Sequence, residues 1–194
     1  CVMAYQTLGY EVKDAIATAG VRSTGGAEAL RDHVPATDAP AVAALKAAGA
    51  IVFGKTNLPE WSGDWQSWNT MFGTTNNPWD LARTPGCSSG GAAEAVACGR
   101  TAFELGTDIG GSVRVPSAFC GVFGLKPTWG VIPTYGYLDL ELWPALIGAA
   151  YLPAVSTPVG FTAGGLPVGV QVVAAHGHAH TAIRVAGWLA EQCG

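Results

Sequence analysis

The segment between Glu141 and Arg184 contains no Lys, Arg, Asp or Glu residue. Within it, residues 154–161 and 168–174 have the pattern of a β-hairpin, joined through Ala163-Gly164-Gly165. A pair of strands this apolar is normally covered by other elements on both faces. We therefore expect the hairpin to need more protein around it than this chain obviously supplies.

The rest of the chain alternates between helical and extended patterns. An Ala-rich helix is expected between Asp38, a candidate N-cap, and Gly49, which would end it. Pro40 falls in the first turn of this helix. Further helices are expected at 91–98, 112–119 and 179–192, and further strands at 10–13, 50–53, 102–105 and 122–125. This alternation predicts an α/β fold, a mixed twisted sheet covered by helices, in one domain spanning 1–194. Residues 54–90 show no sustained period, which is typical of a functional loop system.

Composition excludes several classes of protein. Apolar residues make up 49% of the 194 residues and charged residues 12%, which excludes a disordered chain. The net charge of −4 offers no basic surface for nucleic acid or an anionic membrane. The longest apolar run, Leu142 to Val155, is too short for a membrane helix and contains two prolines.

The cysteines and the N-terminal residues bear on the compartment. Five cysteines cannot all pair and none has C-x-x-C spacing, so we expect structural thiols in a reducing, cytoplasmic environment. A basic N-terminal segment followed by an apolar one is not visible, so we expect no secretory signal.

Three short motifs are weak matches to known sites. Gly49-x-x-x-x-Gly54-Lys55-Thr56 fits the phosphate-loop string, but its middle residues are predicted to form a strand, which cannot cradle a phosphate. Gly86-Cys87-Ser88-Ser89-Gly90 fits the nucleophile elbow of α/β-hydrolases, yet no strand leads into it. His176, His178 and His180 could face one way, but no nearby carboxylate or cysteine completes a metal site, so we expect neither metal nor cofactor.

Two Gly-rich turns carry the strongest signal. Gly86-Cys87-Ser88-Ser89-Gly90-Gly91 is followed by Thr107-Asp108-Ile109-Gly110-Gly111-Ser112-Val113-Arg114. Each turn precedes a short predicted helix, so hydroxyl groups and free N–H groups would meet at one point. Together with Val12-Lys13-Asp14, Gly124-Leu125-Lys126-Pro127-Thr128 and Gly165-Leu166-Pro167-Val168-Gly169-Val170-Gln171, these turns resemble the amidase signature family.

The resemblance implies a serine hydrolase that cleaves carboxamide bonds. Carried over by motif, Ser112 is the nucleophile, Ser88 is the middle serine after a cis peptide bond, and Lys13 is the base. Lys55 lies too close to Ser88 in the sequence and is expected to be structural. A solvated lysine is protonated at pH 7, so Lys13 must be buried to act as a neutral base.

Further residues follow from the same resemblance. The N–H groups of Ile109, Gly110, Gly111 and Ser112 would hold the oxyanion. The side chains expected to brace the two turns by hydrogen bonds are those of Ser89, Thr107, Asp108 and Arg114.

The motifs fall within 1–137, followed by a short connector at 138–152 and the hairpin and last helix at 153–194. The chain lacks the N-terminal helices and the long middle region of the family, and Cys87 stands where glycine is usual.

Three functions remain open from the sequence. The first is an amidase acting on a small-molecule amide, with esters and carbamates within reach of the same acyl-enzyme. The second is a core without competent turnover that acts as a scaffold or interaction domain, with a homodimer formed through the apolar hairpin. The third is the glutamine-hydrolysing component of an amidotransferase, which requires a partner chain.

Overall fold

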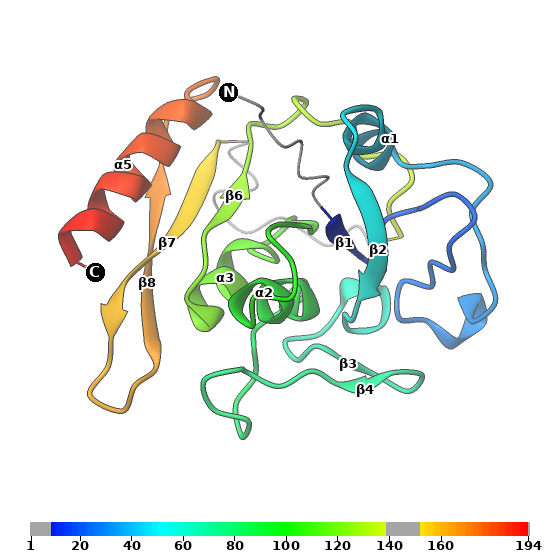
Figure 1. Ribbon diagram of the computed structural model, residues 1–194, viewed down its shortest axis with the longest axis horizontal. Helices are drawn as coiled ribbons and strands as arrows, with labels where there is room; N and C mark the ends of the chain where they lie inside the picture. Colours follow the sequence, from blue (N-terminus) through cyan, green and yellow to red (C-terminus); the bar gives the residue numbers. More distant parts are fainter. Residues whose placement is uncertain (1–8, 139–151, 194) are drawn as a thin grey trace, which may run out of the picture.

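The computed structural model describes residues 9–138 and 152–193, and they form an α/β fold, as the sequence predicted (Figure 1). The strands divide between two three-stranded sheets and one two-stranded hairpin. Parallel and antiparallel pairing therefore both occur, in separate sheets. Most of the predicted connector, residues 139–151, lies outside the described residues.

The first sheet is parallel and holds the N-terminal core. Its strand order is β2 (Ile51–Thr56), β1 (Gly9–Lys13), β5 (Glu104–Leu105). Helix α1 (Pro40–Ala47) packs beside it, and the buried cluster comprises Tyr10, Val12, Ile16, Ala39 and Val42. The central strand β1 is buried at its C-terminal end, where parallel strands commonly place functional residues.

The prediction that Asp38 caps α1 is wrong. Ala39 is the N-cap residue, and no side chain caps the helix. The Asp38 carboxylate instead accepts hydrogen bonds from the Ala19 N–H (2.7 Å) and from Lys46 Nζ (2.8 Å). It therefore ties the helix to the loop after β1, a long-range contact that a local capping pattern does not reveal.

The second sheet is antiparallel and lies between two helices (Figure 1). Its strands are β6 (Gly124–Lys126), β7 (Ala154–Phe161) and β8 (Pro167–Val173). On one face, Thr157 Oγ1 donates to the Ala186 carbonyl of helix α5 (Ala179–Cys193). On the other, a Cβ at Gly169 would lie 2.8 Å from the Ala118 Cβ of helix α3 (Arg114–Cys120). Helices of this chain therefore pack on both faces of the sheet, whereas the sequence led us to expect that the cover would have to come from further protein.

Helix α5 packs through small residues. Ala182 and Ala186 are fully buried against β7, whereas Ile183, Val185 and Trp188 are 40–58% exposed. The apolar pattern of the sequence favours these large side chains as the core-facing stripe. Alanines instead face the sheet, which allows the close approach that the Thr157–Ala186 hydrogen bond requires.

Residues 54–90 are largely irregular, as predicted. They contain one 3₁₀ turn, Glu60–Ser62, and a small hairpin, β3 (Trp68–Asn69) with β4 (Gly73–Thr74), that the sequence pattern did not predict. A second 3₁₀ turn, Glu28–Leu30, lies in the loop between β1 and α1. Helix α2 (Gly90–Ala97) packs against α3 and against the first sheet. The two Gly-rich turns thus enter the core together, at the N-termini of α2 and α3.

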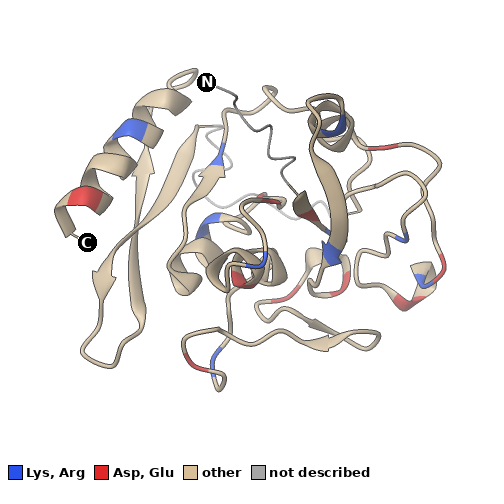
Figure 2. Ribbon diagram, viewed as in Figure 1, with Lys and Arg blue, Asp and Glu red and all other residues tan. Residues whose placement is uncertain are grey.

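Charged side chains are unevenly distributed. Figure 2 shows no charged residue in the β7–β8 hairpin, whereas the first sheet and the loops around it carry most of the charged residues. Val168 and Val170 of β8 and Phe161 at the hairpin end are 39–60% exposed. Among the described residues, no helix is long and apolar enough to cross a membrane.

The homodimer through this hairpin stays a prediction. Because uncharged, exposed apolar strand edges favour pairing, we expect light scattering to give about twice the monomer mass at micromolar concentration. Val170→Lys should convert the dimer to monomer. Val34→Lys, at an exposed valine far from the hairpin in the sequence, is the matched control and should not. A monomeric parent chain would contradict the prediction.

Candidate active site

Lys13 is the last residue of β1 and is fully buried. Its Nζ donates a hydrogen bond to Ser88 Oγ at 2.6 Å and another to Thr107 Oγ1 at 2.5 Å. These contacts join three segments that lie far apart in the sequence. Three of the predicted site residues, Lys13, Ser88 and Thr107, therefore meet in the core.

The turn that carries Ser88 is held by its neighbours on both sides. The peptide bond between Cys87 and Ser88 is cis, and Ser88 is 1% exposed. The Ser89 hydroxyl donates to the Thr107 carbonyl at 3.2 Å and accepts the Thr107 N–H at 3.3 Å. Ser89 thus links the turn before α2 to the loop after β5.

Cys87 is buried beside the Ser88 hydroxyl. Burial and the charge of Asp64 raise the pKa of its thiol to about 11, although Lys13 lowers it. The thiol is therefore neutral at ordinary pH and does not compete as a nucleophile. A cysteine is accommodated at this position with 6% of its surface exposed.

The loop before α3 is organised by Asp108. Its carboxylate accepts the N–H groups of Gly111, Val113 and Arg114, and it pairs with the Arg114 guanidinium through Nε at 2.8 Å and a terminal nitrogen at 2.7 Å. Burial alone would raise the pKa of Asp108, but the hydrogen bonds and charge of Arg114, with those of the backbone, hold it below its usual value. The loop is therefore preformed around an ionised carboxylate.

Ser112 lies in this loop, half-buried, at the edge of the cluster. Its carbonyl accepts the Ser89 N–H at 3.0 Å, so its backbone is joined to the turn that carries Ser88. Among the described residues, no hydrogen bond joins the Ser112 and Ser88 hydroxyls. Of the four N–H groups expected to hold an oxyanion, that of Gly111 donates to Asp108 at 2.9 Å.

Lys55 occupies a different place. It lies in β2, and its Nζ donates to the Ile16 carbonyl, to Thr18 Oγ1 and to Ser23 Oγ. Burial lowers its pKa to about 8, against the charges of Asp14 and Glu104. This is the structural role expected for it. Since Gly54, Lys55 and Thr56 are extended in a strand, the phosphate-loop interpretation stays excluded.

Two residues that support the site were not predicted. Ser67 Oγ donates to the Gly86 carbonyl and accepts the Gly90 N–H, so it holds both ends of the turn that carries Ser88. The Asn57 carbonyl accepts the Gly91 N–H, and a Cβ at Gly91 would lie 2.6 Å from that backbone. Gly91 is therefore required for α2 to approach the end of β2. Both supporting residues lie in the irregular region, where no periodic signal marks them.

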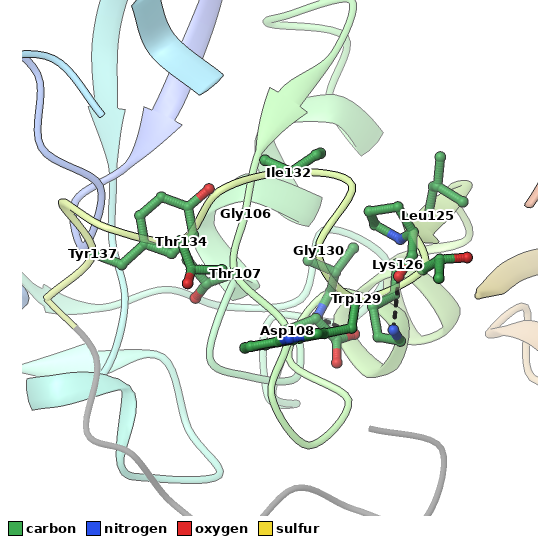
Figure 3. Close-up of a pocket in the computed structure, with 13 residues that line it drawn as sticks. Gly106, Thr107, Asp108, Leu125, Lys126, Trp129, Gly130, Ile132, Thr134 and Tyr137 are labelled. Carbon is green, nitrogen blue, oxygen red and sulfur yellow. Dashed lines mark hydrogen bonds between the residues drawn. The ribbon is translucent and has the colours of Figure 1, made fainter. Parts of the chain in front are cut away.

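A cavity of about 120 Å³ adjoins the loop after β5 (Figure 3). Thr107 and Asp108 form one side, and Trp129, Ile132 and Tyr137 contribute apolar surface. Lys126 is 8% exposed in its wall, and its Nζ donates to the Pro127 carbonyl.

Comparisons with known proteins agree with this geometry. The model of the Amidase family matches residues 10–149. A glutamyl-tRNA(Gln) amidotransferase chain of Roseiflexus sp. is 52% identical over 125 residues, which are 64% of this chain and 26% of that protein.

Two solved structures extend the comparison. The peptide amidase of Stenotrophomonas maltophilia is 38% identical, with a TM-score of 0.65 over 67% of this chain and 28% of that one. A structure described as an amidase has a TM-score of 0.87 over 96% of this chain and 85% of that one, at 20% identity, and so supports the fold alone. This chain spans about a quarter of the length of the curated relatives it matches.

The Asp108–Arg114 pair can be tested by stability. Arg114→Met should lower the free energy of unfolding in urea by about 3–5 kcal/mol, because it leaves a buried carboxylate without its counter-charge. The Arg114 side chain is 6% exposed and that of Asp108 is 3% exposed. Arg83→Met removes an exposed arginine paired with Asp80 and is the control, expected to change little. Equal effects of the two substitutions would contradict the bracing role.

Proposed function

The chain belongs to the Amidase family, and from that premise we propose that it cleaves carboxamide bonds through a serine acyl-enzyme. The observation that carries the proposal is the contact between Lys13 Nζ and Ser88 Oγ, inside the core and beside the loop of Ser112. The substrate is a small-molecule linear amide, and esters and carbamates are open to the same chemistry.

Proton transfer begins at Lys13. A serine hydroxyl is a weak nucleophile until a base takes its proton. Complete burial disfavours the charged form of an amine, so Lys13 can act as a neutral base. In that state its nitrogen accepts the Ser88 proton along the existing contact, and Ser88 Oγ accepts the proton of Ser112.

Ser112 Oγ then attacks the carbonyl carbon and the carbonyl π electrons move to oxygen. The N–H groups of Ile109, Gly110 and Ser112 are the proposed donors to this oxyanion, because that of Gly111 is used by Asp108. The oxyanion collapses, the C–N bond breaks, and the proton returns through Ser88 to the leaving amine. Water then attacks the acyl-enzyme while Ser88 and Lys13 take its proton. The ester bond to Ser112 breaks, the proton returns through Ser88 to Ser112 Oγ, and the acid is released.

The cavity beside Thr107 is the proposed position of part of the substrate. Its apolar wall, formed by Trp129, Ile132 and Tyr137, suits an apolar group. Its volume of about 120 Å³ restricts that group to a small one. This preference guides the choice of test amides.

A serine-directed fluorophosphonate tests the proposal without knowledge of the substrate. We expect one adduct by intact mass, absent in Ser112→Ala and formed about 10²–10⁴-fold more slowly in Lys13→Ala, since the base is lost. Ser117→Ala removes another buried serine, in α3, and should keep the adduct. Lys46→Ala, at a partly exposed lysine paired with Asp38, should keep the rate.

An adduct that persists in Ser112→Ala would exclude Ser112 as the nucleophile. A folded chain that forms no adduct would instead favour the second proposal, a core without turnover that acts as a scaffold or interaction domain. The exposed apolar residues of β8 and α5 are the observation that favours it.

The likeness to amidotransferase chains favours a third proposal, hydrolysis of glutamine for a partner chain. If it holds, glutaminase activity should rise at least tenfold when a second protein chain is added, whereas short aliphatic amides should be poor substrates with or without it. Glutamine hydrolysis unchanged by any partner, or faster turnover of simple amides, would contradict it.

A further inference from the structure

Two glutamates face each other in the first sheet, next to the catalytic cluster. Glu11 of β1 and Glu104 of β5 are register partners on neighbouring parallel strands. Side chains of paired residues in a parallel ladder point to the same face of the sheet. The two side chains therefore lie on the same face, close enough for the charge of Glu11 to act on Glu104, and neither belongs to the chemistry proposed above.

Each carboxyl group has one buried oxygen with no hydrogen-bond partner among the described residues. These atoms are Glu11 Oε2 and Glu104 Oε1. The other Glu104 oxygen accepts a long hydrogen bond, 3.4 Å, from Thr56 Oγ1. Two carboxylates have only acceptors, so their buried oxygens cannot satisfy each other unless a proton lies between them.

The surroundings do not neutralise the pair. The charged groups near it are Lys55 on β2, Glu94 within α2, Arg100 just after α2, and Lys13 two residues along β1; Lys55 and Arg100 offset the charge of Glu104 only in part. Lys55 donates to the 16–23 loop and Arg100 pairs with Glu94, so within the described part of the chain neither cation makes an ion pair with the two glutamates. Burial first, and then the charge of Glu11, raise the pKa of Glu104 to about 8.

The position of the pair gives it a consequence for the site. Strand β5 pairs with β1 through two residue pairs, Glu11 with Glu104 and Val12 with Leu105. Lys13 follows at the end of β1, and Thr107, which accepts its hydrogen bond, follows β5. The glutamates are thus half of the ladder that sets the distance between Lys13 and Thr107.

We propose that Glu11 and Glu104 share one proton, and that the hydrogen bond between their carboxyl groups holds β5 against β1 and so positions Thr107 beside Lys13. They are positioning residues, because they act through the strands and do not touch the reacting atoms. The positioning role rests on the proposed amide hydrolysis, whereas the shared proton does not. Glu11 also lines a cleft of about 600 Å³, from which solvent can exchange the proton.

The raised pKa of Glu104 makes the folding stability depend on pH. A carboxyl group with a raised pKa binds its proton more tightly in the folded chain than in the unfolded chain. Folding stability therefore falls as pH rises from about 4.5 to about 8, and then levels off. Glutamine keeps the shape of a protonated glutamate and cannot ionise, so it removes this dependence while leaving a donor between the strands.

The first measurement compares melting temperatures of the parent chain and Glu104→Gln between pH 5 and pH 9. We expect the variant to be more stable by a margin that widens to about 5–10 °C at pH 8 and then stays constant. Glu11→Gln should behave in the same way and replaces the first variant if that one does not fold. Glu94→Gln, the same substitution in the neighbouring ion pair, should show no widening. A margin independent of pH would overturn the shared proton.

The second measurement follows the rate of fluorophosphonate labelling at Ser112 over the same pH range. The parent chain should lose rate above pH 8, when the shared proton is lost and β5 separates from β1, whereas Glu104→Gln should not. Identical pH profiles would overturn the positioning role. If no chain labels at any pH, the proposed hydrolysis fails, and the melting temperatures still decide whether the proton is shared.

Discussion

The burial of one amine organises this molecule. Lys13 is fully enclosed, and a buried amine is tolerated only where acceptors surround it. Its partners Ser88 and Thr107 come from turns that are 75 and 94 residues away in the sequence. To satisfy Lys13 the chain must therefore bring the end of β1, the turn before α2 and the loop after β5 to one point. The cluster and the fold of the first sheet depend on each other for this reason.

Backbone groups hold the two turns as much as side chains do. Ser89 exchanges hydrogen bonds with Thr107 through its hydroxyl and reaches the Ser112 carbonyl through its N–H. Ser67 closes the turn on the other side by bonding Gly86 and Gly90. Such contacts fix where a hydroxyl points without placing another charged group beside it. A full charge pair, Asp108 with Arg114, shapes the second loop from within.

Local sequence patterns predicted many of the helices and strands, but none of the hydrogen bonds between residues far apart in the sequence. The hairpin strand 154–161 and the helix beginning at 179 follow from their apolar periods, and the strand ending at Lys13 follows from a four-residue run. The places of Lys13, Ser88 and Ser112 came from motif resemblance. Ser67 and the Glu11–Glu104 pair were not predicted, because their partners are set by the tertiary fold. The cap predicted at Asp38 failed for the same reason, because its carboxylate accepts hydrogen bonds from Ala19 and Lys46 instead of from the helix N-terminus.

The residues that orient the candidate catalytic groups are different from those that line the adjoining cavity. The contacts that orient Lys13, Ser88 and the loop of Ser112 all lie within residues 13–114, in well-packed turns at the ends of short strands. The cavity beside them is bounded instead by residues 125–137, many of them exposed, with Trp129 at 61% and Tyr135 at 71% in the same segment. A preorganised hydroxyl cluster needs close packing, because small displacements break short hydrogen bonds. If the proposed hydrolysis holds, change in 125–137 would alter the substrate without disturbing the proposed proton path, because a binding wall tolerates variation.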